Sequence, residues 1–310
     1  MSGSSDPSEV PERLRRLPLR TREAFDAWVR APFDERGLEL IEMPLDPGDV
    51  VIATFPKSGT TWLQQICHGL RSRGDMDFPE ITFAVPWIER GHLFGIDARA
   101  PQRFAPPRVF KTHLEYTNLA KGARYIHVIR DPKDVLVSYY RFLAQGVLDP
   151  AAIPIDAFAE IWLFADLLAE PGSGSLPLCP HLYNYWRHLL DWWQARERAP
   201  VLTLAYENLQ RDLPGHVARV ASFLGVDADR ELIDLATRQA TFAFMAEHRT
   251  QFSDRIPQTE IRFSKVVEGA VGTHRAHVDR ALAARIDDAW RRYVTPVLGV
   301  PSYEALVREL

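Results

Sequence analysis

The sequence predicts an α/β protein: a single domain with a central parallel sheet flanked by helices and a strand-loop-helix anion site. Three observations predict this fold class. Apolar runs rich in β-branched residues alternate with amphipathic segments, as in parallel sheets connected by helices. A Lys-Ser-Gly-Thr-Thr loop lies at one such strand-to-helix junction. A chain of 310 residues with 46% hydrophobic content can bury one large core or two closely joined ones.

The first predicted strand, residues 50–55 (VVIATF), follows the turn signal at 47–49. After the loop, residues 60–70 place Trp62, Leu63, Ile66 and Leu70 on one stripe, which indicates a helix. Free backbone N–H groups and the helix dipole make such a junction a P-loop-like anion site. Lys57 nevertheless precedes the glycine at position 59, the reverse of the usual nucleoside-triphosphate loop, which disfavours an ordinary ATPase or kinase.

Two further units repeat the pattern. Residues 125–129 form an apolar run, and Asp131 and Pro132 then predict the start of a helix. Residues 201–204 predict a third strand, followed by a helix in the segment 217–226 that ends near Gly225. The proline- and glycine-interrupted segments at 78–91, 98–110 and 168–180 are interpreted as loops that shape a ligand crevice.

Composition limits the possible partners and location. The net charge of −4 gives no reason to expect nucleic-acid binding, and no apolar run is long enough to cross a membrane. Cys67 and Cys179 form neither a disulfide framework nor a metal-ligand spacing. The polar N-terminus lacks the apolar segment of a secretory signal, so we expect a cytoplasmic protein. Residues 1–17 are predicted to be a mobile arm and residues 18–310 the folded domain.

Several stretches, in order, resemble the cytosolic sulfotransferase family. They are FPKSGTTW, VPWIE, KTHL, RDPKDVLVSYYRF, YEN and TFAFM, spread over about residues 45–275. The resemblance implies transfer of a sulfuryl group from 3′-phosphoadenylyl sulfate (PAPS) to a hydroxyl or amine, without a metal. Two alternatives stay open: a metal-dependent phosphotransferase that binds ATP, and a non-catalytic nucleotide-binding protein with a decayed donor site.

By this resemblance the donor would contact four groups of residues. The 5′-phosphosulfate would lie against residues 57–62, and the 3′-phosphate against Arg130 and Ser138. The adenine would lie near Tyr206, Thr241 and Phe242, and Gly269 would belong to the closing turn. The implied donor set is therefore Lys57, Ser58, Gly59, Thr60, Thr61, Trp62, Arg130, Ser138, Tyr206, Thr241, Phe242 and Gly269.

The resemblance also implies catalytic roles. His113 would be the general base, since imidazole accepts a proton near neutral pH. Lys57 would stabilise the bridging oxygen of the leaving nucleotide and Lys111 the transferring group, with Ser138 also among the catalytic residues. Trp87 and Phe142, with His113, would line the acceptor pocket. Aromatic side chains there favour a small apolar or aromatic molecule with a hydroxyl group, such as a phenol or a sterol.

One segment departs from the family pattern. Where relatives carry Arg-Lys before a glycine, residues 267–274 read VEGAVGTH, so Val267 and Glu268 replace the two cations that grip the 3′-phosphate. A carboxylate beside a phosphate is repulsive. Another cation is therefore expected to compensate, from Arg262, Lys265 or Arg275. The family's short dimer motif is not recognisable either, which leaves the oligomeric state open.

Overall fold

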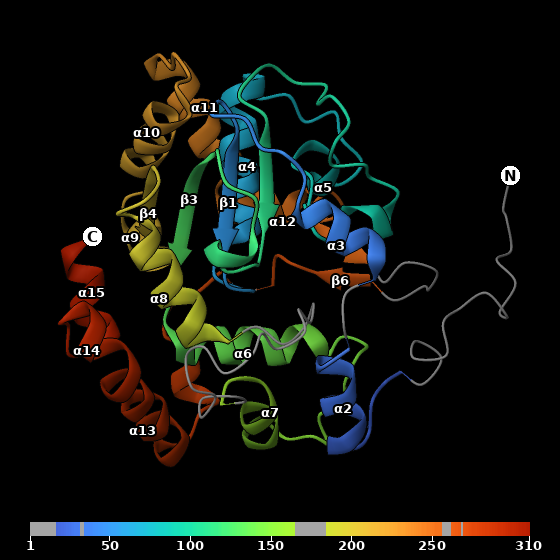
Figure 1. The fold of residues 1–310 in the computed structure, drawn as a ribbon, viewed down its shortest axis with the longest axis vertical. Coiled ribbons are helices and arrows are strands. Elements are labelled where there is room, and N and C mark those ends of the chain that lie inside the picture. The colour runs from blue at the N-terminus through green and yellow to red at the C-terminus, as the bar shows by residue number, and fades with distance from the viewer. Residues whose placement is uncertain (1–16, 32–33, 165–183, 256–261, 268) are drawn as a thin grey trace, which may run out of the picture.

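A computed structural model describes residues 17–31, 34–164, 184–255, 262–267 and 269–310. Its centre is a parallel sheet in the order β2-β1-β3-β4 (Figure 1). These strands are Val109–Thr112, Val50–Thr54, Arg124–Ile129 and Val201–Ala205. The sheet confirms the predicted fold class. The predicted arm and the segment at 168–180 lie outside the described residues, apart from Leu17, so the arm stays a prediction.

Three of the four strands match predicted ones, and β2 was missed. The sequence analysis placed residues 98–110 in a loop, but Val109 and Phe110 pair with Val50 and Val51 of β1. β2 has four residues, one of them Lys111, and two prolines lie just before it. Such a short strand with a charge inside it carries no readable apolar run, so its pairing with β1 decides its conformation.

Every residue of β1 is buried, because helices cover both faces of the sheet. Val50 and Ile52 pack into a core with helices α4 (Thr60–Ser72), α10 (Leu213–Leu224) and α11 (Arg230–Gln239). Val51 and Ala53 point the other way, toward α3 (Glu35–Ile41) and α8 (Tyr185–Ala195). Gly225 caps α10 in the left-handed conformation, as the sequence predicted.

A third apolar cluster lies beyond the carboxyl ends of the strands. It joins α6 (Pro132–Leu143), α7 (Ile155–Trp162), α2 (Arg22–Val29), α13 (Arg280–Ala289) and α15 (Tyr303–Glu309), which form the lower half of Figure 1. Asp131 caps α6 and Pro132 opens it, as predicted. In the described ranges, no helix combines the length and the apolar character needed to cross a bilayer.

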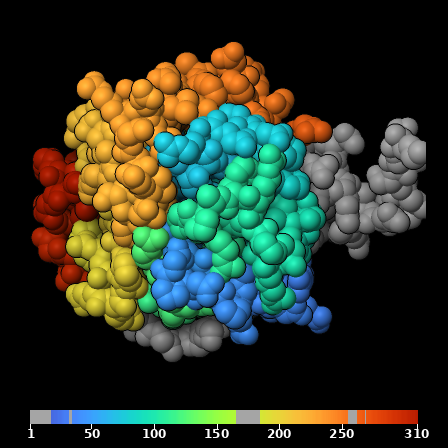
Figure 2. All heavy atoms as spheres, turned by 90° about the horizontal axis from the view of Figure 1, so that it is seen from above, coloured from blue at the N-terminus to red at the C-terminus, as the bar shows by residue number. Residues whose placement is uncertain are grey.

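The remaining elements are short strands, helices and turns. A two-stranded antiparallel sheet pairs β5 (Ser253–Arg255) with β6 (Arg262–Ser264). From above, the blue and the cyan-to-green segments pack side by side, and the red C-terminal helices lie at one edge (Figure 2). The other short elements are α5 (Ile81–Ala84), α9 (Tyr206–Arg211), α12 (Phe242–Glu247), α14 (Thr295–Leu298), 3-10 turns at Gly91–Phe94, Tyr116–Asn118 and Thr273–Ala276, and a π-helical turn at Trp290–Val294.

Candidate active site

The predicted site residues meet at the carboxyl ends of the four strands. The loop with Lys57 follows β1, His113 follows β2, Arg130 follows β3 and Tyr206 follows β4. Open α/β sheets bind ligands at this edge. A cavity of about 780 Å³ lies there. Every predicted site residue except Ser58 lines it.

The loop between β1 and α4 has the backbone shape of an anion cradle. Lys57 and Gly59 both have positive φ, 70° and 106°, so the loop turns its N–H groups inward at the start of a helix. No side chain caps α4, which leaves its first N–H groups for a ligand. A Cβ at position 59 would lie 2.9 Å from Tyr206, which explains the glycine. Ser58 is fully buried beneath the loop, and its N–H donates to the carbonyl of Phe55.

Two lysines point into the cavity over aromatic rings. The Lys57 ammonium lies 4.0 Å from the centre of the Phe142 ring, and that of Lys111 lies 4.3 Å from the Trp87 ring. Burial is the largest effect on both groups and lowers the pKa of Lys57 to about 7 and that of Lys111 to about 8. At pH 7 Lys111 is therefore mostly cationic, whereas Lys57 is near its titration midpoint.

His113 is oriented by its neighbours. Its Nδ1 lies 2.8 Å from the carbonyl oxygen of Thr54, so Nδ1 carries the proton and Nε2 keeps its lone pair. Burial, followed by the charge of Lys111, lowers the pKa of His113 to about 3, so the ring is neutral at working pH. Sequence analysis missed Glu89, which accepts from the N–H of His113 at 2.8 Å and from the Thr112 hydroxyl at 2.9 Å. Glu89 lies in VPWIE, and that motif was the available signal.

Arg130 joins the donor loop to the opposite wall. Its two terminal nitrogens donate to the carbonyls of Lys57 at 3.0 Å and Ala270 at 3.2 Å. Its buried Nε has no partner among the residues that the structure describes. Ser138 lies two turns into α6 and lines the same cavity. Arg130 and Ser138 therefore line the same cavity, although one follows a strand and the other lies in a helix.

Aromatic side chains form a slot beyond the loop. Trp62 and Tyr206 pack edge to face at 5.2 Å, and the Trp62 indole donates to the carbonyl of Ala240 at 2.7 Å. Phe242 is 47% exposed and lines the cavity together with Thr241. A Cβ at Gly269 would lie 2.7 Å from the Phe242 ring, so the backbone closes tightly here. Such a slot fits a planar base.

A second aromatic group lies on the side of His113. The Trp87 and His113 rings meet edge to face at 5.0 Å, and Phe142 stacks on Phe263 at 4.6 Å. Further apolar side chains complete this part of the cavity: Trp28, Leu93, Phe94, Tyr139, Leu143 and Val147. In the described ranges, no group of three or more His, Cys, Asp or Glu side chains could hold a metal ion.

The family model for a sulfotransferase domain matches residues 47–296, more than half of the chain. The chain belongs to the sulfotransferase family. This sulfotransferase is 26% identical over 299 residues to Sulfotransferase 1C2 of Rattus norvegicus, an alignment covering 91% of the chain and 95% of that protein. The protein is therefore an enzyme that moves a sulfuryl group to an acceptor hydroxyl.

Solved structures share the fold. The mouse sulfotransferase SULT7A1 complexed with PAP is 20% identical with a TM-score of 0.64, covering 89% of this chain and 94% of that one. Retinol dehydratase in complex with androsterone and inactive cofactor PAP is 19% identical with a TM-score of 0.64, covering 85% and 86%. These matches agree with the parallel sheet of the sulfotransferase described above.

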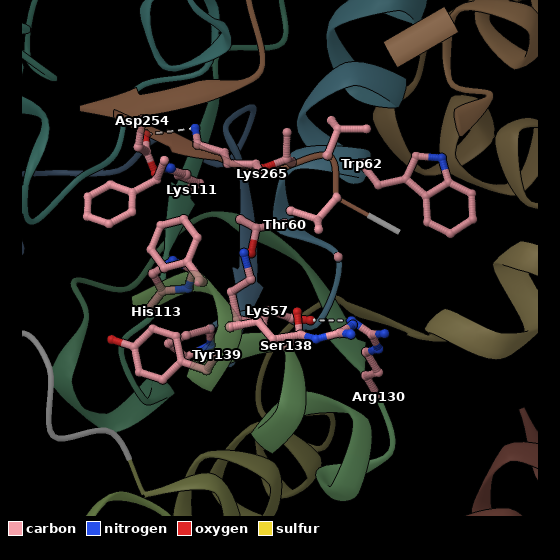
Figure 3. Close-up of a pocket in the computed structure, with 18 of the residues that line it drawn as sticks. Lys57, Thr60, Trp62, Lys111, His113, Arg130, Ser138, Tyr139, Asp254 and Lys265 are labelled. Carbon is pink, nitrogen blue, oxygen red and sulfur yellow. Dashed lines mark hydrogen bonds and ion pairs between the residues drawn. The ribbon is translucent and has the colours of Figure 1, made fainter. Parts of the chain in front are cut away.

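The wall opposite the donor loop holds residues that the sequence analysis missed or gave another role. Lys265, expected near the 3′-phosphate, pairs instead with Asp254 and Glu80, each at 2.8 Å. Figure 3 shows Lys265 and Asp254 near Lys111, on the other side of Lys57 from Arg130. Asp254 belongs to no recognisable sequence motif. The pairing of β5 with β6 brings it to the cavity.

The segment before Gly269 lacks the two cations of the family pattern. Val267 lines the cavity and is 57% exposed, and Glu268 lies outside the described residues. Arg262 is exposed on β6. The Arg275 guanidinium lies 3.1 Å from where a Cβ on Gly272 would be. Among the three cations considered as replacements for the missing pair, Arg275 therefore lies next to the closing turn.

Proposed function

We propose that this sulfotransferase takes its sulfuryl group from PAPS and passes it to the hydroxyl of a small apolar or aromatic acceptor. The observation that carries the proposal is the orientation of His113. Its Nδ1 is bound to the Thr54 carbonyl, so its basic Nε2 belongs to the cavity that Lys57 and Lys111 also line. A neutral base beside two lysines suits the attack of a hydroxyl group on sulfur. The lysines can stabilise the negative charge that develops on the departing oxygen.

The residues present fit the donor. The positive φ values at 57 and 59 form a cradle for a phosphosulfate, and the Trp62, Tyr206 and Phe242 rings fit an adenine. Close backbone approaches at 59 and 269 leave no room for side chains that would fill the same space. Arg130 and Ser138 would hold the 3′-phosphate. When bound, PAPS supplies the sulfuryl group and a nucleotide that leaves with the electron pair of the broken S–O bond.

The chain's own residues provide the proton transfer and the charge. His113 Nε2 accepts the proton of the acceptor hydroxyl as its oxygen forms the new bond to sulfur. Lys57 then stabilises the charge on the bridging oxygen, and Lys111 stabilises the charge of the transferring group. Glu89 holds the His113 backbone and the Thr112 hydroxyl, which fixes the direction of the imidazole.

The acceptor is inferred from the walls around His113. Trp87, Phe142 and Phe263 are aromatic, and the cavity of about 780 Å³ has room for the donor and a second small molecule. An apolar or aromatic acceptor would bury its body against these rings while its hydroxyl reaches Nε2.

A transfer assay with radiolabelled PAPS and a panel of phenols and sterols tests the proposal. We expect labelled product with at least one acceptor, at a rate unchanged by EDTA. Calorimetry without metal should show that adenosine 3′,5′-bisphosphate binds more than about tenfold, or 1.4 kcal/mol, tighter than adenosine 5′-monophosphate. Equal binding of the two nucleotides would contradict PAPS as the donor, and loss of activity with EDTA would contradict a metal-free reaction.

Two further predictions accompany this function. Residues 18–310 are expected to form the sulfotransferase domain, with residues 1–17 dispensable for transfer. The protein is expected to act in the cytoplasm without nucleic-acid or membrane partners. Removal of the arm followed by the transfer assay tests the first, and fractionation of the producing cells tests the second.

A further inference from the structure

A buried ion cluster forms the part of the cavity wall next to the catalytic lysines. The Lys265 ammonium lies 2.8 Å from carboxylate oxygens of both Glu80 and Asp254, and the side chains are 6%, 15% and 15% exposed. Lys265 and Asp254 line the cavity itself. The proposed mechanism gives neither residue a role. A buried cluster of three charges is costly to assemble, and two charged residues facing a catalytic cavity therefore require a reason.

The backbone fixes Asp254 in this position. Asp254 pairs with Phe263 across the β5–β6 ladder, so both side chains lie on the same face of the hairpin and both line the cavity. The N–H of Lys265 donates to the carbonyl of Phe252 at 3.3 Å, which extends the pairing by one step. Lys265 pairs with Asp254 and with Glu80 in the same wall.

Lys57 and Lys111 need a counter-charge. Within the described part of the chain, neither ammonium has a carboxylate within 4.0 Å, and each lies over an aromatic ring instead. Burial disfavours their charged forms. Among surrounding charges, Asp254 is the strongest that favours the charged form, for both lysines. The charges that disfavour the charged form of Lys57 come from Lys265, Arg130 and Lys111.

The other charged groups around Lys111 and His113 do not replace Asp254. Glu80 and Glu89 also favour the charged form of Lys111, but more weakly than Asp254. Burial raises the pKa of Glu89, and its carboxylate is committed to the His113 N–H and the Thr112 hydroxyl. Around His113, the charges are those of Lys111, Asp254 and Arg90.

We propose that Asp254 is a positioning residue whose carboxylate keeps Lys57 and Lys111 cationic before the anionic donor enters. This inference rests on the proposed function, because it assigns the two lysines to the donor and the transferring group. The β5–β6 register sets the place of Asp254 in the wall. The charge of Lys265 acts against the two lysines, so Asp254 and Lys265 have opposite effects on them.

The test measures the two lysines directly in the ligand-free protein. Competitive labelling of amines with a trace anhydride, followed by mass spectrometry across pH, gives the titration midpoint of Lys57 and of Lys111. We expect Asp254→Asn to lower both midpoints by about 0.5 pH unit or more, and Lys265→Met to raise them. Asp254→Glu should keep both midpoints near those of the wild type, because it preserves the charge. Asp288→Asn, an exposed carboxylate on α13, is the matched control and should change neither.

Opposite shifts of the lysine midpoints in Asp254→Asn and Lys265→Met indicate an electrostatic role. A general loosening of the wall would instead shift the midpoints in the same direction in both variants. Midpoints that stay unchanged in both variants, or shift in the same direction, overturn the proposal. If Asp254→Asn does not fold, Lys265→Met and Asp254→Glu alone decide between these outcomes.

A kinetic measurement distinguishes this inference from the proposed function. The alkaline limb of kcat/KM for PAPS should follow the labelling midpoints, to lower pH in Asp254→Asn and to higher pH in Lys265→Met. A wild-type protein that transfers no sulfuryl group would refute the proposed function while leaving the labelling result intact. Normal transfer with unmoved midpoints would refute only the role of Asp254.

Discussion

The two walls of the cavity differ in how they are built. The donor wall, residues 54–62 with Arg130 and Ser138, follows the carboxyl ends of adjacent parallel strands, so the sheet fixes its geometry. The hairpin wall, residues 253–255, 262–267 and 269–273, lies outside the central sheet. Side-chain contacts join it to the elements that follow the strands, such as the Arg130 bond to Ala270 and the Asp134 carboxylate on the Gly272 N–H at 2.6 Å. A wall outside the central sheet can change its charges without moving the donor loop. Val267, which stands where the family pattern has a cation, lies in this wall.

The largest expected effect on turnover comes from removing His113, which follows β2 at the carboxyl ends of the strands. His113→Ala should lower turnover by about 10² to 10⁴, because it removes the base. The fold should persist, which circular dichroism and thermal unfolding would check. His216→Gln on α10, outside the cavity, is a control expected to keep turnover. Near-normal turnover of His113→Ala would remove His113 from the mechanism.

Two lysine variants compare the walls directly. Lys57→Met should lower turnover by about 10² to 10³, the usual loss when one preorganised charge stabiliser is removed. Lys265→Met should lower turnover less, because its charge is already neutralised by Glu80 and Asp254. Steady-state rates with saturating PAPS measure both. A larger loss in Lys265→Met would place the main charge stabiliser on the hairpin wall instead.

The pH dependence follows from the same contrast. The low pKa of His113, about 3, keeps the base neutral across the working range, whereas Lys57, with a pKa of about 7, loses its charge as pH rises. With an alcohol acceptor, kcat/KM for PAPS should therefore fall above about pH 7, by up to about tenfold per pH unit, as the free enzyme titrates. A rise through pH 6.5 would instead indicate a histidine with an ordinary pKa.

The smallest expected effect is a gain on the hairpin wall. Val267→Arg would return a cation to an exposed position lining the cavity. Adenosine 3′,5′-bisphosphate should then bind about two- to tenfold tighter, with little change for adenosine 5′-monophosphate, because a partly exposed ion pair contributes modestly. Val271→Arg is the matched control: it is 44% exposed and outside the cavity lining. Equal gains in both variants would indicate a general charge effect, measured by calorimetry.

Much of the donor wall could be predicted from the sequence by itself. The strands at 50–55, 125–129 and 201–204 have apolar runs, and the loop with Lys57 and Gly59 is a set of consecutive residues. Their conformation depends on local backbone preferences and on burial of every strand residue, and both leave a pattern in the chain. The role of His113 is a prediction from the resemblance of KTHL to the family, and the structure adds the Thr54 carbonyl that orients the ring.

The tertiary structure alone decided the rest. β2 has no readable pattern, since its pairing with β1 rather than its composition makes it a strand. Lys265 was one of three cations considered as substitutes at the 3′-phosphate, but the hairpin register turns it toward Asp254 and Glu80. Charge–charge energies depend on distance and burial, and neither can be obtained from residues far apart in the sequence until the chain has folded. The sequence therefore determined which chemical groups the protein carries, and the fold decided which charges act on one another.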